Sequence, residues 1–248
     1  MTDAALNADR AVVVSGATSG IGRGCAERLV EEGARVWALG SRPETVERLR
    51  DELPGLAGAS ACDVSDEAAV AAAFGELREA LGALDGAFVN AGIDGEGRPA
   101  VDLDAANFRR VLDVNVLGAF LVAREAVRCM EEAGAVVFNA SVNAIKPELH
   151  FADYNASKAA VASLAQTMAL ELAPRGISVV ALCPGYVDTP MSAESLRDPE
   201  RAAEVLAEVP LGRVAQPAEL AVLVSFLLAP QSSYMTGSLV NFDGGRSV

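Results

Sequence analysis

The chain has 248 residues, of which 34 are acidic and 20 are basic, giving a formal net charge of −14 at pH 7. With 51% hydrophobic and 22% charged residues, its composition is that of a globular protein rather than a disordered or collagenous chain. Because no stretch of about 18 apolar residues occurs, we expect no membrane span. The acidic surface repels phosphate backbones, so we also expect no nucleic-acid partner.

The N-terminal segment and the cysteines bear on the cellular location and on the kinds of site that the protein can contain. Residues Met1 to Arg10 contain neither the basic region nor the apolar core of an export signal, so we expect a cytoplasmic protein. A single histidine and four scattered cysteines without a C-x-x-C pair favour neither a metal site nor a disulfide framework, and we expect no bound metal. The chemistry must therefore come from other side chains or from a cofactor. The cysteines are Cys25, Cys62, Cys129 and Cys183.

Short apolar runs alternate with segments of helical periodicity along the whole chain. The first run ends at a glycine-rich turn, and Gly33 stops the helix that follows. The predicted strands are Ala11–Ser15, Ala34–Leu39, Gly58–Cys62, Gly86–Asn90, Gly134–Ala140, Ile177–Cys183 and Ser238–Phe242. The predicted helices are Ile21–Glu32, Pro43–Leu53, Asp66–Leu81, Asn107–Ala133, Phe151–Ala173 and Pro217–Leu228.

This alternation predicts an α/β fold, a Rossmann-type doubly wound parallel sheet of about seven strands with helices on both faces. The strands are too few for an eight-stranded barrel. No linker composition and no repeat interrupts the chain, so we expect a single domain over residues 1–248. The segment Tyr186–Arg213 lacks clear periodicity and follows the sixth strand at the edge where such folds bind ligands. We expect short helical turns there that act as a mobile substrate lid, with a permanently ordered helix pair as the alternative.

The turn between the first strand and the first helix has phosphate-binding character. It reads Gly16-Ala17-Thr18-Ser19-Gly20-Ile21-Gly22. Glycines let the backbone approach a pyrophosphate, whose charge is favoured at a helix N-terminus. The spacing is G-x-x-x-G-x-G rather than the commoner G-x-G-x-x-G. A glycine pattern alone is also explained by a tight strand–helix turn, but its place directly after a strand favours dinucleotide binding.

Further motifs follow the later strands. They are Val89-Asn90-Ala91-Gly92 after the fourth strand, Val114-Asn115-Val116-Leu117-Gly118 on the long helix, Ser141 at the end of the fifth strand, Tyr154-Asn155-Ala156-Ser157-Lys158 thirteen residues later, and Pro184-Gly185-Tyr186-Val187-Asp188-Thr189 after the sixth strand.

In order and spacing, these motifs and the glycine turn resemble the short-chain dehydrogenase/reductase family over nearly the whole chain. Members of that family carry, in this order along the chain, T-G-x-x-x-G-x-G, N-N-A-G, N-x-x-G, a serine, Y-x-x-x-K and P-G-x-x-x-T. Two positions depart from the pattern, since Ser15 replaces the threonine and Val89 replaces the first asparagine. Neither departure affects a catalytic position.

The candidate catalytic residues are Asn115, Ser141, Tyr154 and Lys158. Tyr154 and Lys158 are one helical turn apart, so their side chains project from one face. A free phenol has a pKa near 10, and we expect the Lys158 ammonium to lower it, so that Tyr154 can act as acid or base. Ser141 can donate a hydrogen bond to the substrate oxygen. The resemblance implies that Lys158 also holds the nicotinamide ribose and that Asn115 positions a water that relays protons. For Asn115, a polar side chain satisfied by nearby backbone is the alternative.

The resemblance implies a nicotinamide dinucleotide, with Asp63 against the adenine and Thr189 on the carboxamide. At the end of the second strand, where NAD-binding relatives place an acid, stand Ser41 and Arg42, which suit a 2′-phosphate. We therefore expect NADP(H) to be preferred. NAD(H) remains the alternative, because Arg42 is also explained as a solvated residue and Ser19 stands where many NADP-using relatives carry a base. The candidate cofactor-binding residues are Gly16, Thr18, Ser19, Gly20, Ile21, Gly22, Ser41, Arg42, Asp63, Val64, Asn90, Ala91, Gly92, Tyr154, Lys158, Pro184, Gly185, Val187 and Thr189.

The expected function is hydride transfer between a nicotinamide cofactor and a small secondary alcohol or ketone. A catalytically silent nucleotide-binding protein and a lyase on the same fold are the alternatives, and the intact catalytic motifs argue against both. The candidate substrate contacts are Ser141, Asn143, His150 and Tyr186, in a pocket expected to include Asp94, Val142, Leu149, Met191 and Leu196 as well. For His150, an exposed loop residue is the alternative.

The two long predicted helices carry more apolar and alanine positions than one sheet face can cover. Members of the family pair such helices across a twofold axis. We therefore expect a homotetramer, or failing that a homodimer.

Overall fold

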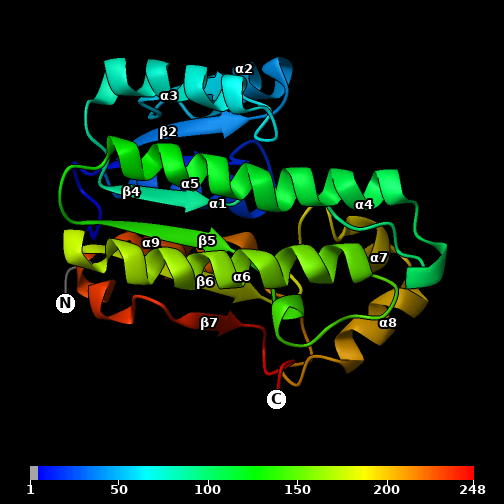
Figure 1. Cartoon of the computed structure of the whole chain (residues 1–248). Coiled ribbons are helices and arrows are strands. Elements are labelled where there is room, and N and C mark those ends of the chain that lie inside the picture. Colours follow the sequence, from blue (N-terminus) through cyan, green and yellow to red (C-terminus); the bar gives the residue numbers. More distant parts are fainter. Residues whose placement is uncertain (1–4) are drawn as a thin grey trace.

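Seven parallel strands form one sheet in the computed structural model of the protein, which describes residues 5–248 and the side chains of all of these except Glu194 and Ser195. Figure 1 shows this sheet between two layers of helices. The strand order β3-β2-β1-β4-β5-β6-β7 confirms the predicted doubly wound parallel fold. The strands are β1 (Ala11–Ser15), β2 (Arg35–Gly40), β3 (Gly58–Ala61), β4 (Gly86–Val89), β5 (Gly134–Asn139), β6 (Ile177–Pro184) and β7 (Leu239–Phe242).

Helices cover both faces of the sheet (Figure 1). Along β1, Val12 and Val14 pack with one layer while Ala11 and Val13 pack with the other, because side chains alternate along a strand. Burial on both faces explains why the central strands read as continuous apolar runs. One layer holds α1 (Gly20–Glu31), α2 (Pro43–Glu52) and α9 (Pro217–Leu228), and the other holds α3 (Glu67–Leu81), α4 (Ala105–Leu112), α5 (Gly118–Cys129) and α6 (Ala152–Leu172).

Polar residues and prolines fix where several helices begin. The Asp66 carboxylate accepts hydrogen bonds from two backbone N–H groups in the first turn of α3. Asp198 caps α8 (Pro199–Ala207) in the same way. In α9, Pro217 occupies the first helical position, where its missing N–H costs nothing, and Gln216 and Glu219 form a capping box.

The predicted long helix Asn107–Ala133 is wrong in two respects. A π-helical turn over Asp113–Leu117 separates α4 from α5, and α5 ends at Cys129. Within the widened turn, the Asn115 side chain pairs with the backbone of Ile93, accepting from its N–H at 2.8 Å and donating to its carbonyl at 2.9 Å. Such π-turns are rare and concentrate at functional sites. The apolar pattern runs across the turn without interruption, so periodicity alone did not reveal it.

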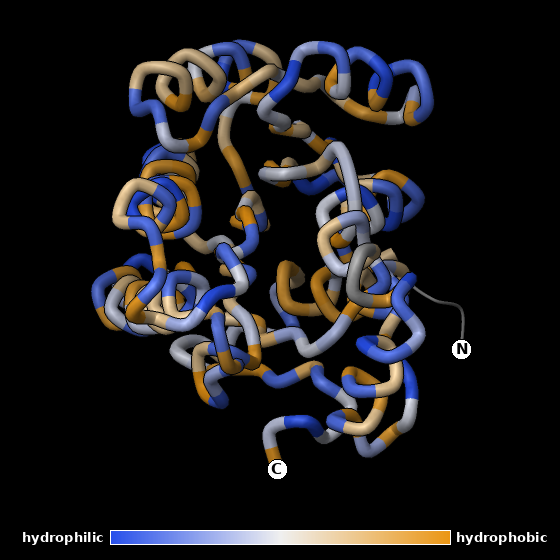
Figure 2. Tube along the Cα trace, turned by 90° about the vertical axis from the view of Figure 1, so that its right-hand side faces the viewer, coloured by the Kyte–Doolittle hydropathy of each residue, from blue (hydrophilic) through white to orange (hydrophobic). Residues whose placement is uncertain are grey.

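The carboxyl ends of the strands meet at one edge of the sheet, which Figure 2 views from the front. The order of strands reverses between β1 and β4, and ligands bind at such a switch point in open α/β sheets. The segment 186–213 contains α7 (Ala193–Arg197) and α8 beside this edge (Figure 1). These are the short helical turns expected there, and their mobility stays a prediction. In the described part of the chain, no helix is both long and apolar enough to cross a membrane.

Candidate active site

A cavity of about 530 Å³ opens at the carboxyl ends of the strands. Its walls combine the glycine turn, the ends of β2, β4 and β5, the first turns of α6 and the segment after β6. Every candidate cofactor-binding residue except Gly22 lines it. Among the candidate catalytic and substrate residues, Asn115 and His150 do not line it.

The glycine turn admits no side chain at its centre. A Cβ atom at Gly22 would lie 2.3 Å from the Gly16 carbonyl oxygen and 2.5 Å from the amide nitrogen of Asn90. Gly16 itself has φ +66°, a conformation that favours glycine. Asn90 braces the turn, because its Nδ2 donates to the Ser15 carbonyl at 2.9 Å and its Oδ1 accepts from Asn139 at 2.8 Å. Asn90 therefore supports the phosphate turn from behind.

Ser15, the first departure from the family pattern, keeps a bracing role. Its hydroxyl accepts hydrogen bonds from the backbone N–H groups of Asn90 at 2.9 Å and Ala91 at 3.1 Å. Any hydroxyl at this position can do so, which explains why serine can replace threonine. The ends of β1 and β4 are thereby tied together at the switch point.

The residues around the turn fit the pyrophosphate of a dinucleotide. No acidic residue lies in the first turn of α1, and the Ser19 side chain does not cap it. The N-terminal N–H groups of this helix thus have no competing side-chain acceptor, and the helix N-terminus favours an anion. Farther along the cavity, Ser41 and Arg42 are both exposed, and Asp63 accepts from the Ser65 N–H and hydroxyl.

Ser141, Tyr154 and Lys158 converge on the other end of the cavity. Lys158 is buried, its Nζ donates to the Asn139 carbonyl at 2.8 Å, and it lies 5.4 Å from the centre of the Tyr154 ring. The Ser141 Oγ accepts from the backbone N–H of Asn143 at 3.1 Å, which orients the hydroxyl at the end of β5. The three side chains come from β5 and α6, as the motif spacing predicted.

At this end of the cavity, the pKa of Tyr154 shifts in the direction opposite to the one expected from the sequence. Removal from water raises the pKa of Tyr154, the Asp94 and Glu148 carboxylates raise it further, and the Ser141 hydroxyl opposes them. Burial lowers the pKa of Lys158 to about 8. The expected lowering of the Tyr154 pKa is therefore wrong for the protein by itself, because burial and two carboxylates outweigh the nearby ammonium.

Asn115 lies behind the cavity wall rather than in it. Besides its pair of bonds to Ile93, its Nδ2 donates to the Ser157 hydroxyl at 3.0 Å. The Asn115 side chain thus links the segment after β4 to α6, at the residue that directly precedes Lys158. This matches the alternative of a satisfied polar residue, and the water-relay role stays a prediction.

His150 faces away from the cavity. It is exposed, its φ is +67°, and the neighbouring Leu149 is 82% exposed. Neither residue lines the cavity, which agrees with the alternative of an exposed loop residue for His150, and their contact with substrate stays a prediction. Asn143, Tyr186, Met191 and Leu196 do line the cavity, as expected.

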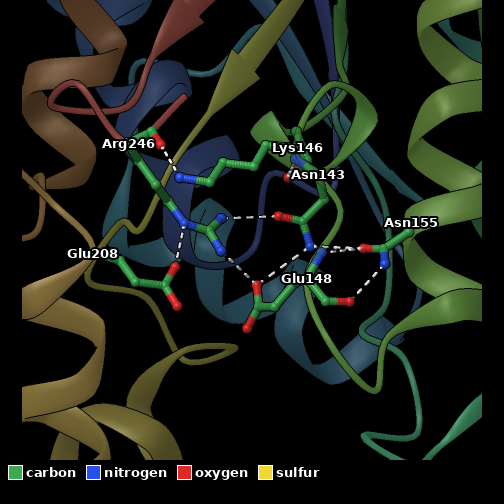
Figure 3. A network of polar contacts seen from close by, with 7 residues as sticks. Asn143, Lys146, Glu148, Asn155, Glu208 and Arg246 are labelled. Atoms are coloured by element: carbon green, nitrogen blue, oxygen red, sulfur yellow. Dashed lines mark hydrogen bonds and ion pairs between the residues drawn. The ribbon is translucent and has the colours of Figure 1, made fainter. Parts of the chain in front are cut away.

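Two wall residues, Glu148 and Arg246, and one buried neighbour of Tyr154, Asp153, escaped the sequence analysis. Glu148 and Arg246 line the substrate end, where Arg246 donates to Glu148 at 3.2 Å (Figure 3). Asp153, buried beside Tyr154, accepts from the Glu96 N–H at 3.0 Å and from Asn107 at 3.1 Å. No motif marks these positions. An acid directly before the motif tyrosine, in the first turn of a helix, was the one available signal.

The described residues contain no group of three or more His, Cys, Asp and Glu side chains suited to a metal ion. All four cysteines are buried and unpaired with one another. Burial raises the pKa of Cys25, Cys62 and Cys183, so these thiols stay protonated at neutral pH.

Comparisons with known proteins agree with this geometry. A family model described as enoyl-(acyl carrier protein) reductase matches residues 16–247. Glucose 1-dehydrogenase of Gluconobacter oxydans (strain 621H) is 37% identical over 248 residues, covering 97% of this chain and 93% of that protein.

Two solved structures share the fold and the sequence. A short-chain type dehydrogenase/reductase from Mycobacterium marinum is 34% identical with a TM-score of 0.90, covering 99% of this chain and 98% of that one. The 3-ketoacyl-(acyl-carrier-protein) reductase from Brucella melitensis, complexed with NADH, is 32% identical with a TM-score of 0.89, covering 97% and 99%. Similarity of this extent, together with a family model that spans the same residues, makes this chain a member of the short-chain dehydrogenase/reductase family of oxidoreductases.

Proposed function

We propose that this oxidoreductase interconverts a small secondary alcohol and its ketone, prefers NADP(H), and uses Tyr154 as its general acid and base. The observation that carries the proposal is the convergence of Ser141, Tyr154 and Lys158 on a cavity whose other end is a phosphate-binding turn. A silent nucleotide-binding protein does not need the three reactive side chains. A lyase does not need the turn.

The chain's own residues handle the substrate oxygen and its proton, while a bound nicotinamide supplies or accepts the hydride. Ser141 donates a hydrogen bond to the substrate oxygen, and Tyr154 gives a proton to that oxygen or takes one from it. The raised pKa keeps Tyr154 protonated at neutral pH, which is the form that donates to a carbonyl oxygen. Lys158 holds the nicotinamide ribose, and Asn115 positions the cavity wall from behind.

The end of β2 supports the preference for NADP(H). A Cβ atom at Gly40 would lie 2.4 Å from the Thr18 methyl group, so the last residue of this strand cannot carry an acid. Arg42 is exposed, lines the cavity and forms none of the ion pairs found among the described residues. Its guanidinium can thus bind a 2′-phosphate. NAD(H) is the second candidate, because a relative was solved with NADH.

The substrate class follows from the catalytic groups and the relatives. One relative is named a dehydrogenase of glucose and another a reductase of a 3-ketoacyl group. Both names fit chemistry at a hydroxyl or keto carbon, which a serine donor and a tyrosine acid can serve. Met191, Leu196 and Val205 add apolar walls to the polar catalytic end.

Exposed apolar side chains support a homo-oligomer, which we propose to be a tetramer. Phe120 on α5 and Leu170 on α6 are exposed on one layer, and Phe226 on α9 and Leu239 on β7 form part of a second exposed set. Light scattering that gives the 25.6 kDa monomer mass at micromolar concentration would contradict this. We also propose a cytoplasmic location, which cell fractionation checks.

Absorbance at 340 nm tests the proposed function. The purified protein is mixed with NADPH or NADH and a panel of small ketones, and with NADP or NAD and the matching alcohols. We expect turnover with at least one pair and a higher kcat/KM with NADPH. Tight nucleotide binding without turnover across the panel would support the silent nucleotide-binding protein, and turnover confined to NADH would remove the cofactor preference.

A further inference from the structure

Arg246 is a buried charged residue in the last segment of the chain. Its side chain is 3% exposed although Val248, two residues later, is fully exposed. It lines the cavity on the side opposite the glycine turn. Burying a guanidinium costs free energy unless its N–H donors are paired. The contacts of Arg246 therefore indicate its role.

Each edge of the guanidinium meets a protein acceptor (Figure 3). Its Nη1 donates to Asn143 Oδ1 at 3.0 Å, its Nη2 to Glu148 Oε2 at 3.2 Å and its Nε to Glu208 Oε2 at 2.8 Å. The group also stacks over the Tyr186 ring, 4.5 Å from its centre.

The Arg246 backbone is anchored separately. The Lys146 Nζ donates to its carbonyl oxygen at 2.6 Å. Because a lysine of the loop between β5 and α6 holds the main chain, the C-terminal segment is fixed at two points, one through its backbone and one through its side chain. The two anchors together hold the guanidinium in one fixed position at the cavity wall.

These contacts join three parts of the chain that carry the substrate end. Asn143 and Glu148 belong to the loop between β5 and α6, Tyr186 follows β6, and Glu208 is the residue that ends α8. Asn143 also connects these contacts to the region of Tyr154, because its Nδ2 donates at 3.0 Å to Asn155, the residue that follows Tyr154. Arg246 is the one residue in Figure 3 that contacts both this loop and α8.

We propose that Arg246 is a positioning residue for substrate binding, clamping the end of α8 to the loop between β5 and α6 and so fixing the substrate end of the cavity. The proposal rests on the proposed function only in taking this cavity as the place where substrate binds. Each of the three guanidinium nitrogens already donates to a protein acceptor, so the contacts that Arg246 makes assign it a role in shaping the wall. Without it, Glu148 and Glu208 would face each other unpaired and repel.

Chemical rescue tests the clamp directly. Arg246→Ala leaves a space of guanidinium size beside two carboxylates, and ~10 mM guanidinium, far below denaturing concentrations, can enter it. With NADPH and the best ketone, we expect kcat/KM to fall between ~10- and ~100-fold, mostly through KM, and guanidinium to restore most of it. Arg246→Lys keeps the charge without the fork and should recover only part of the loss.

A matched control is Arg28→Ala. Arg28 also donates from its guanidinium to a carboxylate, that of Glu32, at 2.7 Å, but lies on α1 outside this cavity. Its variant should keep the wild-type KM and show no response to guanidinium. In all three variants the Kd of NADPH should stay within twofold of wild type. An unchanged KM in Arg246→Ala, or a loss that guanidinium does not restore, would overturn the proposal.

Hydrogen exchange keeps the clamp testable apart from turnover. In Arg246→Ala, we expect faster exchange over residues 142–148 and 199–208, and slower exchange again when guanidinium is added. If the wild type turns over no substrate, the proposed function fails while this exchange pattern still supports the clamp. Exchange unchanged in both segments would refute the clamp even in an active enzyme.

Discussion

At the cofactor end of the cavity, neutral groups and backbone atoms brace one another, whereas at the substrate end charged side chains do so. Asn90 and Ser15 hold the glycine turn through carbonyl, amide and hydroxyl groups at the ends of neighbouring strands. Arg246 holds the far wall through Glu148 and Glu208. The first arrangement depends on backbone shape and has no room for added atoms. The second depends on side chains that can be exchanged singly, so the substrate end can change while the cofactor frame stays intact.

The two tyrosines at the substrate end of the cavity give the largest expected effect. Tyr154→Phe removes the proposed proton donor without removing the ring, so kcat should fall by at least ~10²-fold with an unchanged NADPH Kd. Tyr186→Phe leaves the ring under Arg246 and should lower kcat less than tenfold. Stopped-flow and steady-state kinetics with one ketone measure both. Near-normal kcat in Tyr154→Phe would remove it from the mechanism.

A pair of glycine substitutions probes the cofactor end. Gly22→Ala places a Cβ against the Gly16 carbonyl and the Asn90 amide, and overpacking of this kind costs about 1–3 kcal/mol. We expect NADPH to bind ~10- to ~100-fold more weakly, as measured by fluorescence titration. The control Gly75→Ala lies within α3 with nothing near its added methyl group, and it should stabilise the protein by about 0.5–1 kcal/mol. Equal effects of the two would mean that the turn has spare room.

Arg42→Ala sharpens the comparison within the cofactor end. If its guanidinium binds a 2′-phosphate, losing a charge-assisted hydrogen bond should weaken NADPH binding about tenfold and leave NADH binding unchanged. Arg48→Ala, on the helix that begins directly after Arg42 but placed near Glu52, should change neither affinity. Parallel loss of both cofactors in Arg42→Ala would show a general electrostatic effect instead.

The smallest expected effect is a pH dependence of stability from Lys158. Its folded-state pKa of about 8 lies below its ordinary value of 10.5, so between these pH values the unfolded chain binds more protons than the folded one. The contribution of Lys158 to the free energy of unfolding therefore increases with pH between about 8 and 10.5, and it does not change with pH below about 8. Relative to Lys158→Met, the wild type should gain ~2 °C or more in Tm between pH 7 and pH 10. A Tm difference that does not change with pH would place the Lys158 pKa near its ordinary value.

The sequence predicted the parallel sheet because buried strands leave long apolar runs, and each strand boundary lies within two residues of its expected place. It also predicted that Ser141, Tyr154 and Lys158 meet in one cavity, since helical spacing places Tyr154 and Lys158 together and Ser141 follows the end of a strand. The π-helical turn was missed because it depends on Asn115 pairing with the backbone of Ile93, a contact between distant segments. Arg246 was missed for the same reason, as its partners lie up to 103 residues away.

The direction of the Tyr154 pKa shift was wrong for a different reason. Spacing places an ammonium one helical turn from the phenol, but it cannot show how deeply both groups are buried or that Asp94 and Glu148 lie nearby. His150 was placed near the substrate by its position between two motifs. The positive φ at that residue turns it to the solvent instead.

Every other residue that lines the cavity precedes Arg246 in the sequence, so the cavity wall is completed last during synthesis. The glycine turn, the central strands and the corner formed by Ser141, Tyr154 and Lys158 are all synthesised before Arg246. The wall between α8 and the loop before α6 can close only when residue 246 has been added. A chain that lacks Arg246 would thus retain every residue of the glycine turn while the substrate end stays unclamped. Such a truncated protein would still bind the cofactor but would bind substrate weakly. These two properties together would distinguish early termination or C-terminal proteolysis from misfolding.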